Sequence, residues 1–267
     1  MDPNPEVLAE LRDGFAVLTM NRPEKRNALT ASLLESLTAQ LERLQREGDA
    51  RCVVLRGAGD DAFSVGMDLT AMAEQTPEEN QRLIGEGGPL RRATAAIEDH
   101  PFPVIAMVKG FGIGAACELA VSCDLRVGCG QTRMGMPPAK LGILYPPEGM
   151  ERFVMTLGFP ATRKLFYSAR YFDGPELFAM DVLDFMCGDE LEGFTFELAR
   201  DLAANAPLSM IGEKRTLRAI ADAGGLKLDA GRRHIVNDLV LHAMRSDDAR
   251  EGIAAFLEKR RPDFKGQ

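Results

Sequence analysis

Residues 104–119 read VIAMVKGFGIGAACEL, an apolar run followed by a glycine-rich turn and a short apolar segment that carries one carboxylate. The run Val104–Val108 is typical of a buried strand, because it is short and rich in β-branched residues. The glycines allow the backbone to approach a ligand closely. We expect the segment through Glu118 to be a short helix. A strand, a turn and a helix in this order predict an α/β fold.

Similar units are expected on both sides of this stretch. The other predicted strands are Val7–Arg12, Ala16–Met20, Cys52–Arg56 and Leu125–Val127. The first two flank the turn Asp13-Gly14. The first two-thirds of the chain therefore alternates short strands with helices.

Helix signals lie between and after these strands. Leucines at helical spacing predict a helix that Gly48 ends, with Ser32 and Glu35 as a candidate capping box. Thr76-Pro77-Glu78-Glu79 is a second helix start, and that helix must break at Gly85–Pro89. The later predicted helices begin at Pro160 and Pro175 or span Glu190–Ala204, Leu208–Ala223, Gly231–Arg245 and Asp248–Arg261.

The domain organisation follows from this order of elements. We expect a single α/β core over residues 1–200, with a C-terminal helical region over residues 201–267. The sequence contains no low-complexity linker between them.

The composition excludes several classes of protein. Of the 267 residues 45% are hydrophobic and 27% are charged, and the net charge of −8 argues against nucleic-acid binding. The sequence has no apolar run of membrane-spanning length and no recognisable secretory signal. The five cysteines are odd in number and include no C-x-x-C pair, so they indicate reduced thiols rather than a metal site. We expect a cytoplasmic protein.

Three loops between predicted strands and helices are candidates for the functional site. They are Asn21–Leu29, Gly57–Leu69 and Lys109–Leu119. Ligands of open α/β sheets collect at loops that leave the carboxyl ends of strands. The third loop also satisfies the dinucleotide pattern G-x-G-x-x-A from Gly110 to Ala115, but residues 129–136 lack the acidic residue of a true fingerprint. We therefore do not expect a nicotinamide or flavin cofactor.

The three loops resemble signatures of the crotonase family, also called the enoyl-CoA hydratase/isomerase family. Residues 21–29 (NRPEKRNAL) are similar to its first signature, residues 63–69 (FSVGMDL) to its F-x-x-G-x-D-L loop, and residues 104–119 to its segment with the catalytic glutamate. Residues 251–260 (EGIAAFLEKR) are similar to its closing helix. The resemblance covers nearly the whole chain and implies a spiral of repeated ββα units with a helical C-terminal trimerisation region.

The resemblance also implies how the site works. The amides of Met67 and Ala115 are expected to form an oxyanion hole for a thioester enolate, with Gly114 beside it. Such a backbone donor is worth on the order of 3 kcal/mol in the transition state. Glu118 takes the place of the family's catalytic glutamate. A carboxylate on this apolar segment must be paired or have a raised pKa, and a raised pKa suits a general base, so the alternative is a buried structural glutamate.

The sequence departs from the family's hydratases at Pro138, which stands where they carry a second glutamate. Proline cannot hold a proton, so hydration by two glutamates is in doubt. Glu148 in an E-G pair is similar to the proton shuttle of the family's Δ3-Δ2-enoyl-CoA isomerases, although its spacing from Leu141-Gly142 is longer. Glu148 equally suits the first turn of a helix.

Coenzyme A is expected to bind along the same loops as part of the substrate, with no separate cofactor. The candidate binding residues are Lys25, Arg26, Ala28, Val65, Asp68, Leu69, Gly114 and Lys259. The three histidines, His100, His234 and His242, lie outside these loops.

We therefore expect an enzyme that acts on an acyl-CoA thioester, and the sequence favours double-bond isomerisation over hydration. Decarboxylation or thioester hydrolysis through the same enolate, or a non-catalytic acyl-CoA-binding scaffold, are the alternatives. A homotrimer or homohexamer is expected, with neither nucleic acid nor membrane as a partner.

Overall fold

The computed structural model describes residues 5–223, 231, 234, 235, 238, 246–258, 260 and 262–267. Its larger sheet has the strand order β1-β2-β3-β5-β7-β10. These strands are β1 (Val7–Arg12), β2 (Phe15–Met20), β3 (Val53–Gly57), β5 (Val104–Val108), β7 (Leu125–Gly128) and β10 (Phe185–Met186). The first pair is antiparallel and the remaining pairs are parallel. The predicted strands are thus confirmed to within two residues.

A smaller sheet has the order β4-β6-β8-β9. Its strands are β4 (Ala62–Ser64), β6 (Phe111–Ile113), β8 (Arg133–Gly135) and β9 (Phe172–Asp173). Each of β3, β5 and β7 is followed along the chain by a strand of this sheet and then by helical residues. The predicted spiral of ββα units is confirmed. Its second strands were not predicted, because two or three residues are too few to display an alternating pattern.

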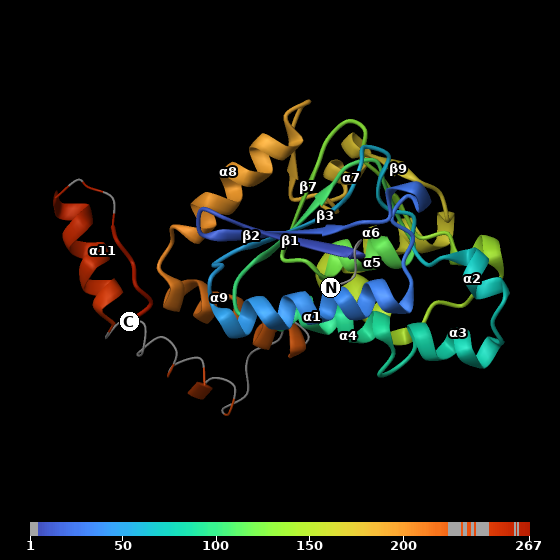
Figure 1. Ribbon diagram of the computed structural model, residues 1–267, viewed down its shortest axis with the longest axis horizontal. Helices are drawn as coiled ribbons and strands as arrows, with labels where there is room; N and C mark the ends of the chain where they lie inside the picture. The colour runs from blue at the N-terminus through green and yellow to red at the C-terminus, as the bar shows by residue number, and fades with distance from the viewer. Residues whose placement is uncertain are drawn as a thin grey trace.

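Helices cover both faces of the larger sheet (Figure 1). The α-helices are α1 (Ala31–Glu47), α2 (Leu69–Ala73), α3 (Pro77–Ile84), α4 (Pro89–Glu98), α5 (Ala115–Ser122), α6 (Pro147–Ser168), α7 (Gly174–Ala179), α8 (Leu191–Ala203), α9 (Pro207–Asp222) and α11 (Asp247–Glu258), and the 3-10 helices are η1 (Pro23–Lys25) and η2 (Pro138–Leu141). The helix α1 packs on β1, β2 and α4, whereas α8 packs on β2, β3, β5 and β7 from the other side.

The helix ends follow the predicted signals with one correction. Thr30, rather than Ser32, caps α1, because its hydroxyl accepts from the Leu33 amide. The Ser32 hydroxyl instead donates to Glu6. Gly48 ends α1 in the left-handed conformation with φ 70°, as predicted. The capping box at Thr76 is confirmed, and the chain breaks between α3 and α4 where the glycines predict.

The C-terminal third is helical as predicted. Gly158, with φ 70°, interrupts α6 two residues before Pro160. The predicted domain boundary at residue 200 falls inside α8, which packs on the sheet, so α8 lies with the core. Most of the predicted helix Gly231–Arg245 lies outside the described residues. None of the described helices is long and apolar enough to cross a membrane.

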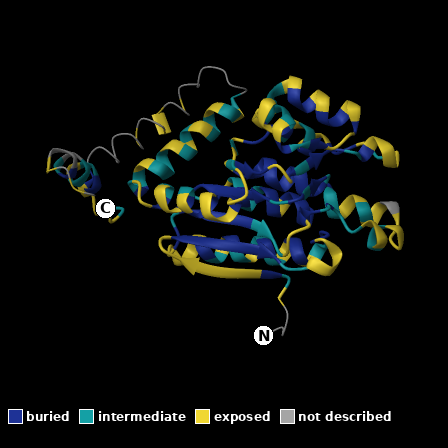
Figure 2. Ribbon diagram, turned by 90° about the horizontal axis from the view of Figure 1, so that it is seen from above, coloured by how far each residue is buried: buried dark blue, intermediate teal, exposed yellow. Residues whose placement is uncertain are grey.

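The core lies between the larger sheet and the helices beneath it, where Figure 2 shows buried residues concentrated. The leucines of α1 at positions 33, 34, 37, 41 and 44 are each at most 1% exposed. Burial of each such side chain stabilises the fold by about 1.5–3 kcal/mol. All eight residues of α5 are buried, because α5 packs between α4, α6 and β6. Any polar side chain on α5 must therefore find its partners inside the protein.

Candidate active site

Two predicted loops meet at the N-terminus of α5. Gly66 adopts φ 86°, and a Cβ built there would lie 2.4 Å from the Ile113 carbonyl oxygen and 3.4 Å from the Ala115 nitrogen. A larger residue would push these loops apart. Glycine at position 66 therefore permits the close approach that an oxyanion hole needs.

The two predicted donors lie outside the local hydrogen-bond ladder. Leu29 N donates to Gly66 O and Asp68 N donates to Leu29 O, so this parallel bridge does not use the Met67 amide. Ala115 is the first residue of α5, where an N–H group has no acceptor within the helix. The helix dipole places partial positive charge at the same point. The Met67 and Ala115 amides therefore both lie outside the hydrogen-bond pattern of their neighbours, which is what an oxyanion hole would require.

Glu118 lies one turn further along α5 and is completely buried. Arg91 of α4 contacts both carboxylate oxygens: Nη2 donates to Oε2 at 2.5 Å, and Nη1 lies 2.5 Å from Oε1 as an ion pair outside hydrogen-bond geometry. Arg152 of α6 donates from Nη1 to Oε1 at 2.6 Å. The Tyr145 hydroxyl donates to Oε2. Both oxygens of Glu118 are therefore engaged by donors.

This pairing compensates the cost of burying the carboxylate, which is several kcal/mol for an unpaired ion. Burial, followed by the charge of Glu118, raises the pKa of Tyr145 well above its ordinary value. Its phenol therefore remains protonated and acts as a hydrogen-bond donor rather than a base. Burial lowers the pKa of Arg152, but its contacts with Glu98 and Glu118 outweigh this effect and raise it overall. The cluster of Arg91, Glu118, Tyr145 and Arg152 is hereafter called the glutamate cluster.

The glutamate cluster limits what Glu118 can do. To accept a proton from a substrate, the carboxylate must first give up one of its four contacts. Two of those contacts are with guanidinium groups, and charge-assisted hydrogen bonds are roughly twice as strong as neutral ones. The oxyanion hole, in contrast, needs no rearrangement. The arrangement is better suited to stabilising an enolate than to removing a proton to form one.

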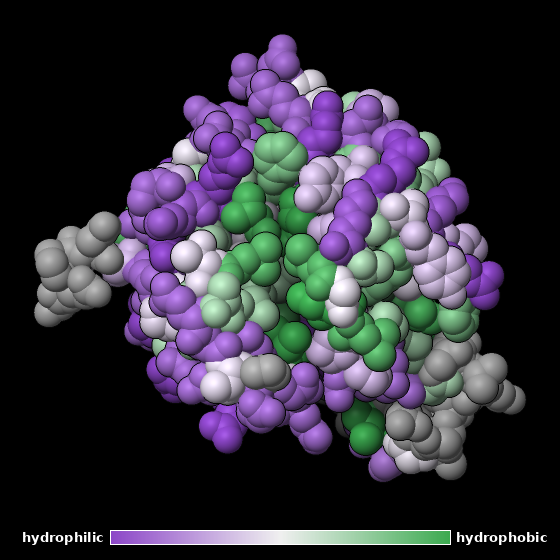
Figure 3. Space-filling view, turned by 90° about the vertical axis from the view of Figure 1, so that its right-hand side faces the viewer, coloured by the Kyte–Doolittle hydropathy of each residue, from purple (hydrophilic) through white to green (hydrophobic). Residues whose placement is uncertain are grey.

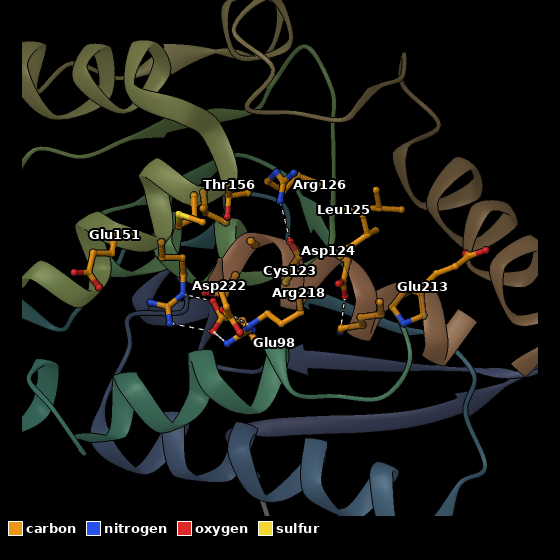
Figure 4. Close-up of a pocket in the computed structure, with 18 of the residues that line it drawn as sticks. Glu98, Cys123, Asp124, Leu125, Arg126, Glu151, Thr156, Glu213, Arg218 and Asp222 are labelled. Carbon is orange, nitrogen blue, oxygen red and sulfur yellow. Dashed lines mark hydrogen bonds and ion pairs between the residues drawn. The ribbon is translucent and has the colours of Figure 1, made fainter. Parts of the chain in front are cut away.

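Glu148 is exposed in the first turn of α6. Its neighbour Gly149 is buried, and a Cβ at that position would lie 2.5 Å from the Tyr145 ring and 3.1 Å from Glu118 Oε1. The Glu148 side chain lines a groove of about 930 Å³ together with residues of α4, α5, α6 and α9, among them Glu98 and Arg152 (Figure 4). The Glu148 side chain thus lines this groove, whereas its neighbour Gly149 lies beside Tyr145 and Glu118.

Pro138, at the position of the family's second glutamate, is buried in η2. It contributes no titratable group. The structure therefore offers no replacement carboxylate at that position.

Most of the predicted coenzyme A residues lie near one another. Lys25 and Arg26 are exposed, and Ala28 is buried just after them. Val65 N donates to Arg26 O at 3.2 Å, which joins the first two loops. Asp68 caps α2 and lies 3.5 Å from Arg22.

Three further residues are predicted to bind coenzyme A. Leu69 begins α2 and is 53% exposed, and Gly114 caps α5 with φ 58°. Lys259 lies outside the described residues.

The thiols and histidines form no catalytic or metal-binding group among the described residues. The five cysteines are unpaired, and burial raises the pKa of both Cys52 and Cys117 to about 12. Among the described residues no group of histidine, cysteine or acidic side chains is arranged to hold a metal ion. His100 is buried and contacts the Phe102 carbonyl, whereas His234 is exposed and His242 lies outside the described residues.

Comparison with known proteins shows to which family the chain belongs. The model of the enoyl-CoA hydratase/isomerase family matches residues 10–267. The chain belongs to this family. It is 31% identical to the methylmalonyl-CoA decarboxylase of Escherichia coli, with 94% of each chain covered. It is also 31% identical to a probable enoyl-CoA hydratase of Bacillus subtilis, covering 94% of this chain and 95% of that one. The crystal structure of an enoyl-CoA hydratase from Bacillus anthracis is 26% identical with a TM-score of 0.87, covering 98% of this chain and 100% of that one.

Within the enoyl-CoA hydratase/isomerase family, the unexpected feature of this chain is the glutamate cluster. Sequence reasoning did not identify Arg91, Tyr145 or Arg152. A carboxylate on a wholly apolar helix signals that partners must exist, but the partners lie 27 and 34 residues away in the sequence. Only the packing of α4 and α6 against α5 brings them together.

Proposed function

We propose that this chain decarboxylates a 2-carboxyacyl-CoA thioester, forming the enolate by loss of carbon dioxide. The observation that carries the proposal is the glutamate cluster, in which both oxygens of Glu118 are engaged by Arg91, Arg152 and Tyr145. Hydration and isomerisation both need a carboxylate that is free to exchange protons. Decarboxylation makes the same intermediate without a base.

The proposed reaction uses the oxyanion hole directly. The bond between the α-carbon and the carboxyl carbon breaks, and its electron pair passes into the thioester to form the enolate. The amides of Met67 and Ala115 stabilise the enolate oxygen. A proton from water then replaces the lost carboxyl group on the α-carbon. The products are carbon dioxide and the shorter acyl-CoA.

The comparisons are consistent with this choice. One of the relatives at 31% identity is named a methylmalonyl-CoA decarboxylase, and several other relatives are named hydratases. The sequence alone favours isomerisation, and the glutamate cluster, which the sequence does not reveal, moves the preference to decarboxylation.

The test is a comparison of substrates with the purified protein. Methylmalonyl-CoA, crotonyl-CoA and a 3-enoyl-CoA are incubated separately, and the products are identified by mass spectrometry. We expect loss of carbon dioxide from the first thioester to be the fastest reaction. Fast hydration of crotonyl-CoA with no decarboxylation would contradict the proposal.

Double-bond isomerisation is the second candidate, and Glu148 is the observation that favours it. Glu148 directly precedes Gly149, at which a Cβ would lie only 3.1 Å from Glu118 Oε1, so a second carboxylate stands next in the sequence to a residue beside Glu118. In this reaction Glu148 would move a proton between the two ends of a three-carbon unit. Conversion of a 3-enoyl-CoA that is lost in Glu148→Ala would identify it.

We further propose that no cofactor is needed beyond the coenzyme A of the substrate, and that the protein assembles as a homotrimer or homohexamer. Exposed apolar side chains on the C-terminal helices, such as Leu217 and Ile220 of α9, support assembly. Viewed from the side of α2 and α3, the surface also has an apolar, hollowed centre within a hydrophilic rim (Figure 3). Light scattering that finds a monomer at micromolar concentration would contradict the assembly.

A further inference from the structure

Arg152 is shared between two carboxylates. Its Nε contacts Glu98 Oε1 and its Nη2 lies 3.2 Å from Glu98 Oε2, while Nη1 lies 2.6 Å from Glu118 Oε1. The guanidinium group is a rigid planar fork. Because Glu98 holds two of its nitrogens, it fixes the direction in which the third points. Glu98 thus aims Arg152 at Glu118.

Glu98 is itself held from α9. Arg218 Nη2 lies 3.2 Å from Glu98 Oε2, and Arg218 Nε lies 3.5 Å from Asp222 (Figure 4). The side chain of Arg218 is 40% exposed, that of Glu98 is 16% exposed and that of Glu118 is fully buried. A chain of ion pairs therefore runs from the surface of α9 to the centre of the site.

We propose that Arg152 is a positioning residue that holds Glu118 in its working orientation, with its own direction set by Glu98 and Arg218. The inference rests on the proposed function, in which Glu118 accepts no proton and stays held by its arginines one turn from the Ala115 amide. The charged and titratable groups that face Glu118 are Arg91 from α4, Tyr145 from the segment before α6, Arg152 from α6 and Cys117 within α5. The strand β6 presents no titratable side chain.

Two substitutions test the two ends of this arrangement. Arg152→Gln removes a positive charge beside Glu118, so its carboxylate becomes easier to protonate. Glu98→Gln leaves one acceptor oxygen in place of two, so the Arg152 fork is no longer fixed, its contact with Glu118 weakens, and the carboxylate again becomes easier to protonate. If Glu98 did not position Arg152, the loss of its negative charge alone would make Glu118 harder to protonate, which is the opposite sign.

Tyr145 provides a readout that does not depend on activity. The chain contains three tyrosines and no tryptophan. In a Tyr167→Phe/Tyr171→Phe background, all tyrosine emission comes from Tyr145, whose hydroxyl donates to Glu118. Protonation of Glu118 replaces the charged acceptor with a weaker neutral one and changes this emission. The pH midpoint of the change therefore follows the charge of Glu118.

The matched control is Asp184→Asn. Asp184 is the partly exposed partner of another buried arginine, Arg126, at 2.5 Å. This pair lies outside the glutamate cluster, and its loss removes the same kind of contact. We expect Asp184→Asn to leave the Tyr145 midpoint unchanged.

The experiment follows Tyr145 emission against pH, with circular dichroism recorded in parallel so that only folded protein is compared. We expect the midpoint to rise in both Arg152→Gln and Glu98→Gln. Arg152→Gln should also lower kcat on the order of a hundredfold with little change in KM, as for a misplaced catalytic group. Arg152→Lys should not restore kcat, because one ammonium group cannot contact both carboxylates.

The kinetic measurements use whichever thioester the wild-type protein converts. If that thioester is an enoyl-CoA, the proposed decarboxylation is wrong, while the Tyr145 midpoints still test the role of Arg152. A midpoint that falls in Glu98→Gln, or that does not move in Arg152→Gln, would overturn the inference. An equal shift in Asp184→Asn would overturn it as well.

Discussion

The first and second turns of α5 differ in whether their polar groups already have hydrogen-bond partners. At the first turn, the amide of Ala115 has no partner within the helix and faces the Met67 loop. One turn further, every contact of the Glu118 carboxylate is taken by Arg91, Arg152 or Tyr145. The first turn is prepared to receive negative charge, whereas the second is not free to receive a proton. This difference is the basis of our proposal that the enolate is stabilised here but is not made by deprotonation.

The largest expected effect on kcat comes from a substitution that moves the Met67 amide away from the first turn of α5. Gly66→Ala places a Cβ 2.4 Å from the Ile113 carbonyl oxygen at a residue with φ 86°, so the Met67 amide must move away from Ala115. Loss of one oxyanion-hole donor lowers kcat on the order of a hundred- to a thousandfold. Steady-state kinetics measure the loss. Gly188→Ala, where a Cβ meets no atom within 4 Å, is the control and should retain activity; a fully active Gly66→Ala variant would exclude Met67 from the oxyanion hole.

The second turn is tested by Glu118→Gln. The substitution leaves the buried guanidiniums of Arg91 and Arg152 without their shared counter-ion, which should cost about 3–5 kcal/mol in the free energy of unfolding. Displacement of the cluster should also lower kcat on the order of a hundredfold. Urea denaturation and product formation give the two values. Unchanged stability would show that the ion pairs contribute nothing, and unchanged turnover would remove Glu118 from the mechanism.

A smaller effect is expected at the coenzyme A loop. Lys25 and Arg26 are exposed, so replacing either with alanine should raise KM for an acyl-CoA only roughly two- to fivefold, the scale of a surface charge contact. The effect should weaken at high salt. Arg43→Ala, which removes an exposed cation of α1, should leave KM unchanged. A fall in kcat with constant KM would assign these two residues to the reaction instead of to binding.

The smallest effect is expected for Glu148→Ala. Because Glu148 is exposed, its removal should change kcat for decarboxylation by no more than about twofold. The equilibrium constant of unfolding should change by no more than about twofold as well. Glu151→Ala, an exposed neighbour on α6, is the control. A large and selective loss of 3-enoyl-CoA conversion in Glu148→Ala would instead support isomerisation.

The sequence predicts the fold and the first turn of α5 better than the second. Strands such as Val104–Val108 have a local pattern that predicts them directly. Gly66 marks a close backbone contact and Gly114 a positive φ, so the glycines of the sequence also indicate the turns that form the first turn's surroundings. The three-residue strands of the smaller sheet have too little sequence for any period.

The partners of Glu118 could not be predicted for a different reason. Arg91 and Arg152 each lie on a helix with ordinary amphipathic spacing, and nothing local distinguishes a buried arginine from an exposed one. Their burial results from three helices packing together. Charge pairing at this distance in the sequence is a property of tertiary structure.

Hydrogen exchange at the substrate's α-carbon in deuterium oxide tests the central claim most directly. If the enolate forms by loss of carbon dioxide and not by deprotonation, each decarboxylated product gains a single deuterium, and a saturated acyl-CoA such as butyryl-CoA gains none. The mass spectrum of recovered thioester reports both results. Exchange of the α-hydrogens of butyryl-CoA by the wild-type protein, abolished in Glu118→Gln, would contradict the account, because it would show Glu118 working as a base despite its bound arginines.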